Sequence, residues 1–306
     1  MQMKSIFFAS VIALTACARL DANLYNNSTL TQYSLDNYQG KTDITVDSSY
    51  NIPSNLIIPL QDEIISNDGT SEQKVYSYFL GDRTQIGTPG YKVILYCHGN
   101  RDHMDFYWPR IKLLANVGDK NRYGVLAFDY RGFGMTGGEP SEEGLYVDTA
   151  AAINWLESEG LASSDFIIYG FSMGTAPAVE LTANPRGNLV ASKIILEAPF
   201  ASAEVMVQDS TLLAIPDSMV TNLKIDNAEE IKKLTNVPLL WIHGTADDFL
   251  SIHTHGEIVY KNHPGVDGVN KHAVRVSGGG HTDIPVKLGS TPLVDYTVTL
   301  FDFIEG

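Results

Sequence analysis

The sequence predicts an α/β fold with a mostly parallel, eight-stranded sheet and helices on both faces. Runs of four to six apolar residues, the usual length of buried strands, alternate with stretches of helical periodicity along most of the 306 residues. The first two apolar runs, residues 56–58 and 75–79, have no helical pattern between them. We therefore expect them to open the sheet as antiparallel strands.

Six further strands are predicted where an apolar run is bounded by glycine or polar residues: 92–97, 123–129, 166–169, 193–197, 238–243 and 273–276. Helical patterns separate them, at residues 108–117, 141–159, from 173 onward, 252–260 and 292–303. Strands joined through helices run parallel, and both faces of such a sheet are covered. A chain of this length can form the whole arrangement as one domain.

The composition excludes one class of partner. The chain has 36 acidic and 21 basic residues, which gives a formal net charge of −15. Nucleic-acid binding needs a basic face to contact phosphates, so we expect no nucleic acid as a partner. The same charge gives no electrostatic attraction to anionic lipid.

The N-terminus predicts export and a lipid anchor. Residues 1–16 combine a positive start at Lys4 with a short apolar stretch, as in a signal peptide. The sequence Leu14-Thr15-Ala16-Cys17 resembles the bacterial lipoprotein box, which implies that Cys17 is lipidated and anchors the protein to a membrane. Ala18 in place of aspartate favours the outer membrane, on the periplasmic side. A secretory signal with a chance cysteine is the alternative.

The domain boundaries follow from these patterns. We expect residues 17–50, which are polar and show no clear periodicity, to form the lipidated N-terminus and a tether. The folded domain is then 51–306. About forty residues separate the strands that end near 197 and begin near 238, which is long for a simple crossover and predicts a small helical lid at about 200–236. Its apolar residues either line a pocket or pack between helices: Met206, Leu212, Leu213, Ile215, Met219 and Val220.

A nucleophilic serine is predicted at Ser172. It stands between Gly170 and Gly174 in a G-x-S-x-G pattern, after an apolar strand and before residues that can continue as a helix. A sharp turn that exposes a serine strains its backbone, and side chains two positions away would collide with it. The alternative is an ordinary glycine-rich turn between a strand and a helix.

A serine hydroxyl needs a base, and the base needs an acid that orients it. In a fold of this type the acid and then the histidine follow the serine, each after a later strand. Asp247 and Asp248 both follow the strand that ends at His243, and either can be the acid. His281 lies on a loop with three glycines after the last strand, so we expect it to be the base.

Stabilisation of an oxyanion needs two convergent backbone N–H groups. One is predicted to be that of Met173, directly after the serine. The other comes from the loop after strand 92–97, where we expect the N–H of Asn100, with that of Gly99 as the alternative.

Several other polar residues are expected to be structural. His98 is predicted to brace its loop, and Asp129 and Arg131 to hold a turn by charge-assisted hydrogen bonds. His253 and His255 resemble a metal-binding pair only superficially, because no acidic or cysteine ligands accompany them at zinc spacing. We expect both of these histidines to be exposed.

These motifs together resemble the α/β-hydrolases, in particular the branch of depalmitoylating thioesterases and of monoacylglycerol and lysophospholipid lipases. The similarity covers about residues 92–284 and is carried by six motifs in family order: His98-Gly99-Asn100, Asp129-Tyr130-Arg131-Gly132 with its following glycines, Tyr169 to Thr175, Leu196-Glu197-Ala198-Pro199-Phe200, His243-Gly244-Thr245-Ala246-Asp247 and Gly280-His281-Thr282-Asp283. Eukaryotic depalmitoylases have a cysteine-rich N-terminal segment where this chain has a lipoprotein signal. Residues 102–108 also replace the small residues usual after His-Gly-Asn.

The resemblance favours Asp247 over Asp248. It implies a serine hydrolase that cleaves carboxylic esters or thioesters of small-molecule or lipid acyl substrates through an acyl-enzyme, without a metal or organic cofactor. A serine peptidase that uses the same residues is one alternative. A non-catalytic surface lipoprotein that retains the fold is another.

Overall fold

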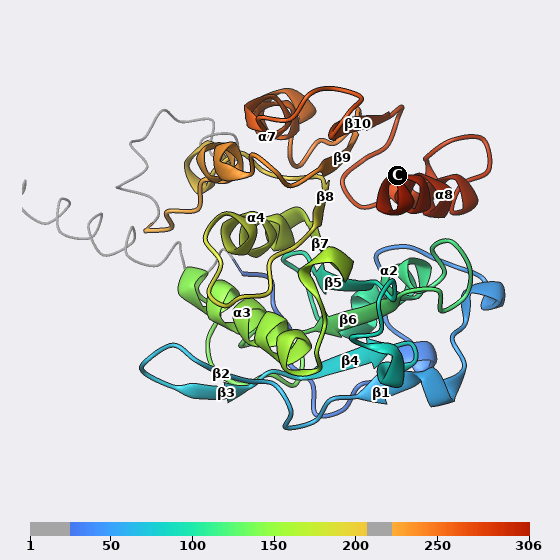
Figure 1. The fold of residues 1–306 in the computed structure, drawn as a ribbon, viewed down its shortest axis with the longest axis vertical. Helices are drawn as coiled ribbons and strands as arrows, with labels where there is room; N and C mark the ends of the chain where they lie inside the picture. The colour runs from blue at the N-terminus through green and yellow to red at the C-terminus, as the bar shows by residue number, and fades with distance from the viewer. Residues whose placement is uncertain (1–24, 207–221) are drawn as a thin grey trace, which may run out of the picture.

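The computed structural model describes residues 25–206 and 222–306 (Figure 1). Its centre is an eight-stranded sheet in the order β1-β4-β6-β5-β7-β8-β9-β10. Strand β4 pairs antiparallel with both β1 and β6, and the remaining pairs are parallel, which confirms the predicted fold class. The strands are β1 (Ile57–Pro59), β4 (Ser77–Leu80), β6 (Gly124–Phe128), β5 (Val93–Cys97), β7 (Phe166–Phe171), β8 (Lys193–Glu197), β9 (Leu239–Gly244) and β10 (Lys271–Val276).

The central strands are apolar throughout because each faces a core on both sides. In β5, Leu95 and Cys97 point into one core and Ile94 and Tyr96 into the other. Four helices pack on the first side: α3 (Glu142–Ser158), α4 (Thr175–Ala183), α6 (Asn227–Glu230) and α7 (Glu257–Asn262). Two pack on the other, as Figure 1 shows: α2 (Met104–Leu114) and α8 (Val294–Glu305).

Helix α2 begins earlier than its sequence pattern predicts. It starts at Met104 rather than near Trp108 and contains Pro109, which can give no hydrogen bond to the preceding turn. The helix tolerates the loss because its apolar side chains, among them Phe106 and Ile111, are buried against the sheet. The predicted start of this helix was therefore wrong by about one turn.

A small hairpin, β2 (Ile65–Asn67) with β3 (Glu72–Lys74), was not predicted. Its second strand is polar, so it has no apolar run to reveal it. Asp68 shapes the turn by accepting the backbone N–H groups of Thr70 and Ser71 at 2.8 and 2.7 Å. The hairpin lies beside α3 (Figure 1).

The tether predicted for residues 17–50 is wrong for residues 25–50, which belong to the folded domain. Tyr33 and Ile44 are buried, and Tyr33 donates a hydrogen bond of 2.6 Å to Asp129. Asp43 is also buried and forms an ion pair with Arg110 on α2. The attachment depends on a few isolated side chains and buried polar bonds, which produce no periodic pattern. Residues 17–24, the signal peptide and Cys17 lie outside the described residues.

The predicted lid is described only at its ends. Residues 207–221, which include five of its six apolar candidates, lie outside the described part, while Met206 packs partly against the core. The C-terminal part of this region is helical, as expected: it forms α6 and a 3-10 turn, Ile231–Lys233. Within residues 25–206 and 222–306, no helix combines the length and apolar character needed to cross a bilayer.

Candidate active site

Ser172 lies in a strained turn directly after β7. Its φ is +51°, in the left-handed region that costs energy for any residue with a side chain. A 3-10 turn, Ser172–Gly174, leads from the strand into α4. The flanking glycines are needed for close packing. A Cβ at Gly174 would lie 2.0 Å from the carbonyl oxygen of Cys97, and one at Gly170 would lie 2.6 Å from that of Gly174.

The structure brings Ser172, His281 and Asp247 into direct contact. His281 Nε2 lies 2.8 Å from Ser172 Oγ, and His281 Nδ1 lies 2.8 Å from Asp247 Oδ2. Parallel strands explain the meeting, since β7, β9 and β10 end at the same edge of the sheet and each is followed by one of the three residues. The imidazole can therefore bridge hydroxyl and carboxylate, as the sequence motifs predict.

The surroundings of Asp247 keep it ionised and fixed. Its Oδ1 accepts the backbone N–H groups of Phe249 and Leu250 at 3.0 and 2.8 Å. Burial of the carboxyl raises the pKa of Asp247, but interactions with His243 and His281 outweigh burial and lower this pKa below its ordinary value. A charged Asp247 can hold the Nδ1–H of His281 as a hydrogen-bond donor.

The two acids that the sequence motif left open differ in position. The Asp247 side chain is fully buried and contacts His281, whereas Asp248 is exposed. His243, predicted to be structural, lies beside the acid, because its Nε2 is 3.3 Å from Asp247 Oδ2 and 2.9 Å from the carbonyl oxygen of Leu250.

The loop that carries His281 is held from several sides. The Gly280 N–H donates to Asp283 Oδ1 at 2.6 Å, and the Ala246 N–H donates to the carbonyl of Gly279 at 2.8 Å. Aromatic rings flank the imidazole, with the centroids of Phe171 and Phe249 at 5.5 and 5.0 Å. The Phe249 side chain is 62% exposed, so an apolar surface borders the histidine on the solvent side.

The predicted oxyanion segments lie at the same sheet edge as Ser172. Strand β5 pairs with β7, with Cys97 opposite Gly170, so the loop after β5 and the turn at Met173 leave the sheet side by side. Asn100 is half-buried, and its side-chain oxygen accepts the N–H of Asn26 at 3.0 Å. The role of the Met173 N–H, and of the Asn100 or Gly99 N–H, stays a prediction.

Asp129 and His98 support that loop from below, as expected. Asp129 Oδ1 lies 3.1 Å from His98 Nε2, while its Oδ2 accepts the Tyr33 hydroxyl at 2.6 Å and the Met104 N–H at 3.2 Å. His98 Nδ1 lies 2.7 Å from the carbonyl of Gly99. Both residues are buried, which fits a bracing role.

Arg131 is also structural. Its guanidinium pairs with Asp148 on α3 at 2.8 Å and with Asp68 of the hairpin turn. The Arg131 backbone N–H donates to Asp148 at 2.7 Å as well. These bonds fix the turn after β6 to the helix and hairpin that cover it.

One expectation about the histidines is wrong. His253 is exposed as predicted, but His255 is fully buried, and its Nδ1 accepts the Ala201 N–H at 3.2 Å. The difference arises because the segment Ile252–Gly256 is a π-helix whose inner side packs beneath residue 201. Among the residues that the structure describes, no group of three or more His, Cys, Asp or Glu side chains could hold a metal ion.

Sequence motifs missed a buried charged cluster beneath the histidine loop. Arg110 on α2 lies between Asp43 of the N-terminal segment and Glu197 at the end of β8, and all three side chains are fully buried. The signal available in the sequence was weak: Arg110 and Glu197 each stand beside a run of mostly apolar residues. Nothing local indicates that they pair.

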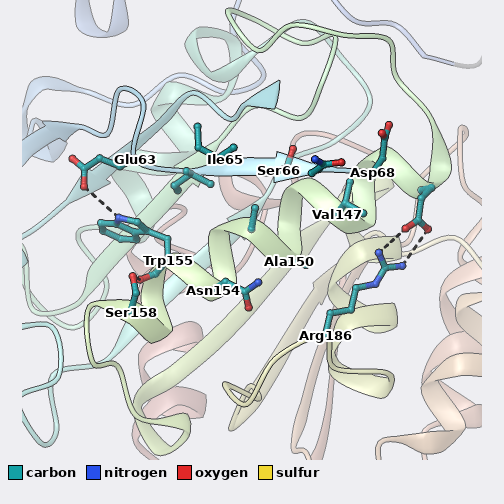
Figure 2. A pocket seen from close by; sticks show the side chains of 14 residues that line it. Glu63, Ile65, Ser66, Asp68, Val147, Ala150, Asn154, Trp155, Ser158 and Arg186 are labelled. Carbon is teal, nitrogen blue, oxygen red and sulfur yellow. Dashed lines mark hydrogen bonds and ion pairs between the residues drawn. The ribbon is translucent and has the colours of Figure 1, made fainter. Parts of the chain in front are cut away.

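A separate surface cavity of about 640 Å³ lies between the β2–β3 hairpin and α3 (Figure 2). Its charged side chains are already paired: Arg186 binds Glu143 at 2.7 and 3.1 Å, and Glu63 accepts the Trp155 indole N–H at 3.3 Å. Neither Ser172, Asp247 nor His281 lines it. We therefore assign the candidate chemistry to the Ser172 site and none to this cavity.

Comparison with known proteins agrees with this geometry. Residues 92–228 match the sequence profile of the α/β hydrolase fold. The chain is 30% identical over 210 residues to α/β hydrolase domain-containing protein 17C of Xenopus laevis, covering 67% of this chain and 61% of that protein. It is 29% identical to YfhR of Escherichia coli over 60% of this chain and 62% of YfhR. The chain thus spans about three-fifths of the length of these relatives.

Among solved structures, the esterase Pf2001 of Pyrococcus furiosus superposes with a TM-score of 0.61 at 18% identity, covering 87% of this chain and 98% of the esterase. At that identity the likeness concerns the fold alone. The sheet order, the strained serine turn after β7 and these matches lead to one conclusion: the chain has the α/β-hydrolase fold.

Proposed function

We propose that this protein is a serine hydrolase that cleaves carboxylic esters or thioesters through an acyl-enzyme on Ser172. The observation that carries the proposal is the continuous contact from Ser172 Oγ through His281 to Asp247, with 2.8 Å at each step. Both distances are those of hydrogen bonds that can pass a proton and hold its acceptor in place.

In the first half-reaction, Ser172 Oγ attacks the carbonyl carbon of the substrate while its proton moves to His281 Nε2. Asp247 stabilises the resulting imidazolium through Nδ1–H. The oxygen of the tetrahedral intermediate becomes negative and accepts the N–H groups of Met173 and Asn100. The bond to the leaving alcohol or thiol then breaks, and His281 returns the proton to that group.

In the second half-reaction, His281 Nε2 takes a proton from water as the water oxygen attacks the acyl carbon. The new tetrahedral intermediate collapses with cleavage of the bond to Ser172 Oγ, and His281 gives the proton back to the serine. The products are a carboxylic acid and free enzyme, so no electrons are exchanged with a cofactor.

An apolar acyl group is favoured by what borders the site. The exposed ring of Phe249 lies beside the imidazole, and the buried ring of Phe171 also contacts it. Burying such aromatic surface against a substrate chain is favourable, and a peptide backbone would gain less from it. This supports acyl esters or thioesters over peptides as substrates.

A fluorophosphonate probe tests the nucleophile. We expect the wild-type protein to be labelled at Ser172 and Ser172→Ala to remain unlabelled. Label on another residue would refute the assignment, and an unreactive wild-type protein would favour a non-catalytic role for the fold.

A substrate series tests the chemistry. Rates on p-nitrophenyl esters from acetate upward, measured beside an acyl-thioester and a peptide p-nitroanilide, separate the classes. The proposal requires ester or thioester turnover that is lost in Ser172→Ala; turnover of the anilide alone would identify a peptidase.

We also propose that Cys17 is lipidated and holds the protein on the periplasmic side of a bacterial outer membrane. The support is the Leu14-Thr15-Ala16-Cys17 sequence after an apolar stretch. Replacement Cys17→Ser should move the protein from the membrane fraction to the soluble fraction. Unchanged fractionation would contradict the anchor.

A further inference from the structure

A buried ionic cluster lies directly under the loop that carries His281. Its centre is Arg110 on α2, and its guanidinium has three partners in three directions. Nε donates to Asp43 at 2.6 Å, Nη1 donates to Glu197 at 2.5 Å, and Nη2 donates to the carbonyl oxygen of Thr282 at 2.8 Å. The third partner is the backbone of the residue next to His281.

The guanidinium also supports the histidine through an aromatic ring. Its central carbon lies 4.2 Å from the centroid of the Phe171 ring, and the same ring also lies 5.5 Å from the imidazole of His281, measured between centroids. Arg110 therefore reaches the histidine by two routes, one through the backbone of the loop and one through the ring beneath it.

The two carboxylates keep this arginine charged and oriented. Burial lowers the pKa of Arg110, but Glu197 and Asp43 raise it well above its ordinary value. Glu197 is held in turn by the hydroxyl of Tyr296 at 2.7 Å and by that of Tyr169. With both carboxylates in place, the guanidinium cannot rotate without breaking a buried charged hydrogen bond.

We propose that Arg110 is a positioning residue for His281, and that the N-terminal segment 25–50 completes the buried ionic cluster by supplying Asp43. This rests on the proposed serine hydrolase function and adds a determinant of its efficiency. Arg110 does not touch the reacting atoms. It keeps Thr282, and with it the imidazole, in reach of Ser172.

Lysine cannot replace this arginine. The planar guanidinium sends donors to Asp43, Glu197 and Thr282 at the same time, whereas an ammonium is a single point charge and cannot span all three. We therefore expect Arg110→Lys to lower kcat for an ester, and the rate of fluorophosphonate labelling, by at least about tenfold with KM little changed.

A neutral triple variant tests whether a loss of activity comes from the lost contact to Thr282 rather than from unfolding. A lone buried charge is destabilising, but replacing all charges of a buried cluster together is often tolerated. Asp43→Asn with Arg110→Met and Glu197→Gln keeps the volume and removes the donor to Thr282. Where thermal melting shows it folded, its labelling rate should fall at least as far as that of Arg110→Lys.

The matched control is the neighbouring ion pair between the same two elements. Lys112 on α2 binds Asp36 of the N-terminal segment at 2.6 Å and does not contact the histidine loop. Lys112→Met with Asp36→Asn should leave kcat and the labelling rate within about twofold of wild type. An equal fall in this control would overturn the proposal, because it would show that any loosening of the segment suffices.

The low-field NMR signal of the His281 Nδ1 proton distinguishes a failure of the Arg110 proposal from a failure of the hydrolase proposal. We expect it in the wild type and the control, and we expect it broadened or lost in the Arg110→Lys and triple variants. Folded variants with wild-type rates and signal would refute the role of Arg110 while leaving the hydrolase intact. A wild type with the signal but no labelling would instead refute the hydrolase.

Discussion

Ser172 holds a backbone conformation that its side chain makes costly. Its φ of +51° is tolerated because β7, α4 and the two flanking glycines leave no other path for the chain. The strain presents Oγ to the imidazole and is therefore part of the site. A residue without a Cβ would carry no such cost.

This strain can be measured by comparing two inactive variants. We expect Ser172→Gly to have a free energy of unfolding about 1 kcal/mol higher than Ser172→Ala, because both lack the hydroxyl and only glycine adopts a positive φ freely. Chemical denaturation measures the difference. An alanine variant as stable as the glycine variant would show that the turn is unstrained.

The choice of acid gives a second prediction. Asp247→Asn should lower kcat on an ester by about 10⁴-fold, since the amide no longer favours the reactive tautomer and charge of His281. Asp248→Asn, a change of the exposed neighbour, should leave kcat within about twofold. Steady-state kinetics on both variants decides, and a larger effect at Asp248 would reverse the assignment.

Asp247 also makes stability depend on pH. Its pKa is lower in the folded protein than in the unfolded chain. Its contribution is therefore complete above the unfolded value of about 4 and is lost as pH falls below that value. We expect Asp247→Asn to be less stable than wild type at pH 7, with the gap narrowing in acid. Urea unfolding across pH tests this; a constant gap would contradict it.

At the scale of elements, the N-terminal segment is the one whose role the sequence did not reveal. It forms isolated bridges at Asn27 and Thr29, buries Tyr33 and Ile44, and delivers Asp43 to Arg110. Because Tyr33 binds the same carboxylate that braces His98, the segment supports the proposed oxyanion loop as well as the histidine loop.

A single hydroxyl tests whether this segment is structural. Tyr33→Phe removes a donor from the buried Asp129 and should lower the free energy of unfolding by about 1–3 kcal/mol. Tyr38→Phe, in the same segment but with a half-buried side chain, should change it by less than about 0.5 kcal/mol. Equal, negligible effects would restore the tether interpretation.

For the whole molecule, the sheet is the scaffold and its carboxyl edge is the site. Each parallel strand from β5 to β10 delivers a loop to that edge, and helices on both faces hold the strands in register. The order of serine, acid and histidine along the chain was predictable because each follows a recognisable strand. The three side chains come close together because parallel strands end at the same edge of the sheet.

Truncation tests where the domain begins. A chain that starts at residue 51 loses Tyr33, Asp43 and Ile44, so Arg110 and Asp129 each lose one buried partner. It should melt at least several degrees below a chain that starts at residue 25, and it should label more slowly with fluorophosphonate. Equal melting temperatures and labelling rates would move the boundary back to residue 51.

Local signals were sufficient to predict the fold, Ser172 and His281, and they reduced the candidates for the acid to two adjacent residues. An apolar run indicates a buried strand. A serine between two glycines indicates a tight turn, because larger residues at the glycine positions would collide with the backbone. Both signals come from residues that are neighbours in the sequence. Strand boundaries agreed to within a few residues for the same reason. Asp247 and Asp248, in contrast, are adjacent, so local signals left both open; the family resemblance favoured Asp247, and the fold buries that residue against the histidine.

The N-terminal segment and the Arg110 cluster were not readable in this way. The partners of Arg110 lie 67, 87 and 172 residues from it along the chain. Such a pairing leaves no periodic pattern, because each charge looks isolated until the helix, the strand end and the two loops come together. A buried charge is stable only when its partner is present, so the role of these residues can be recognised only in the folded protein.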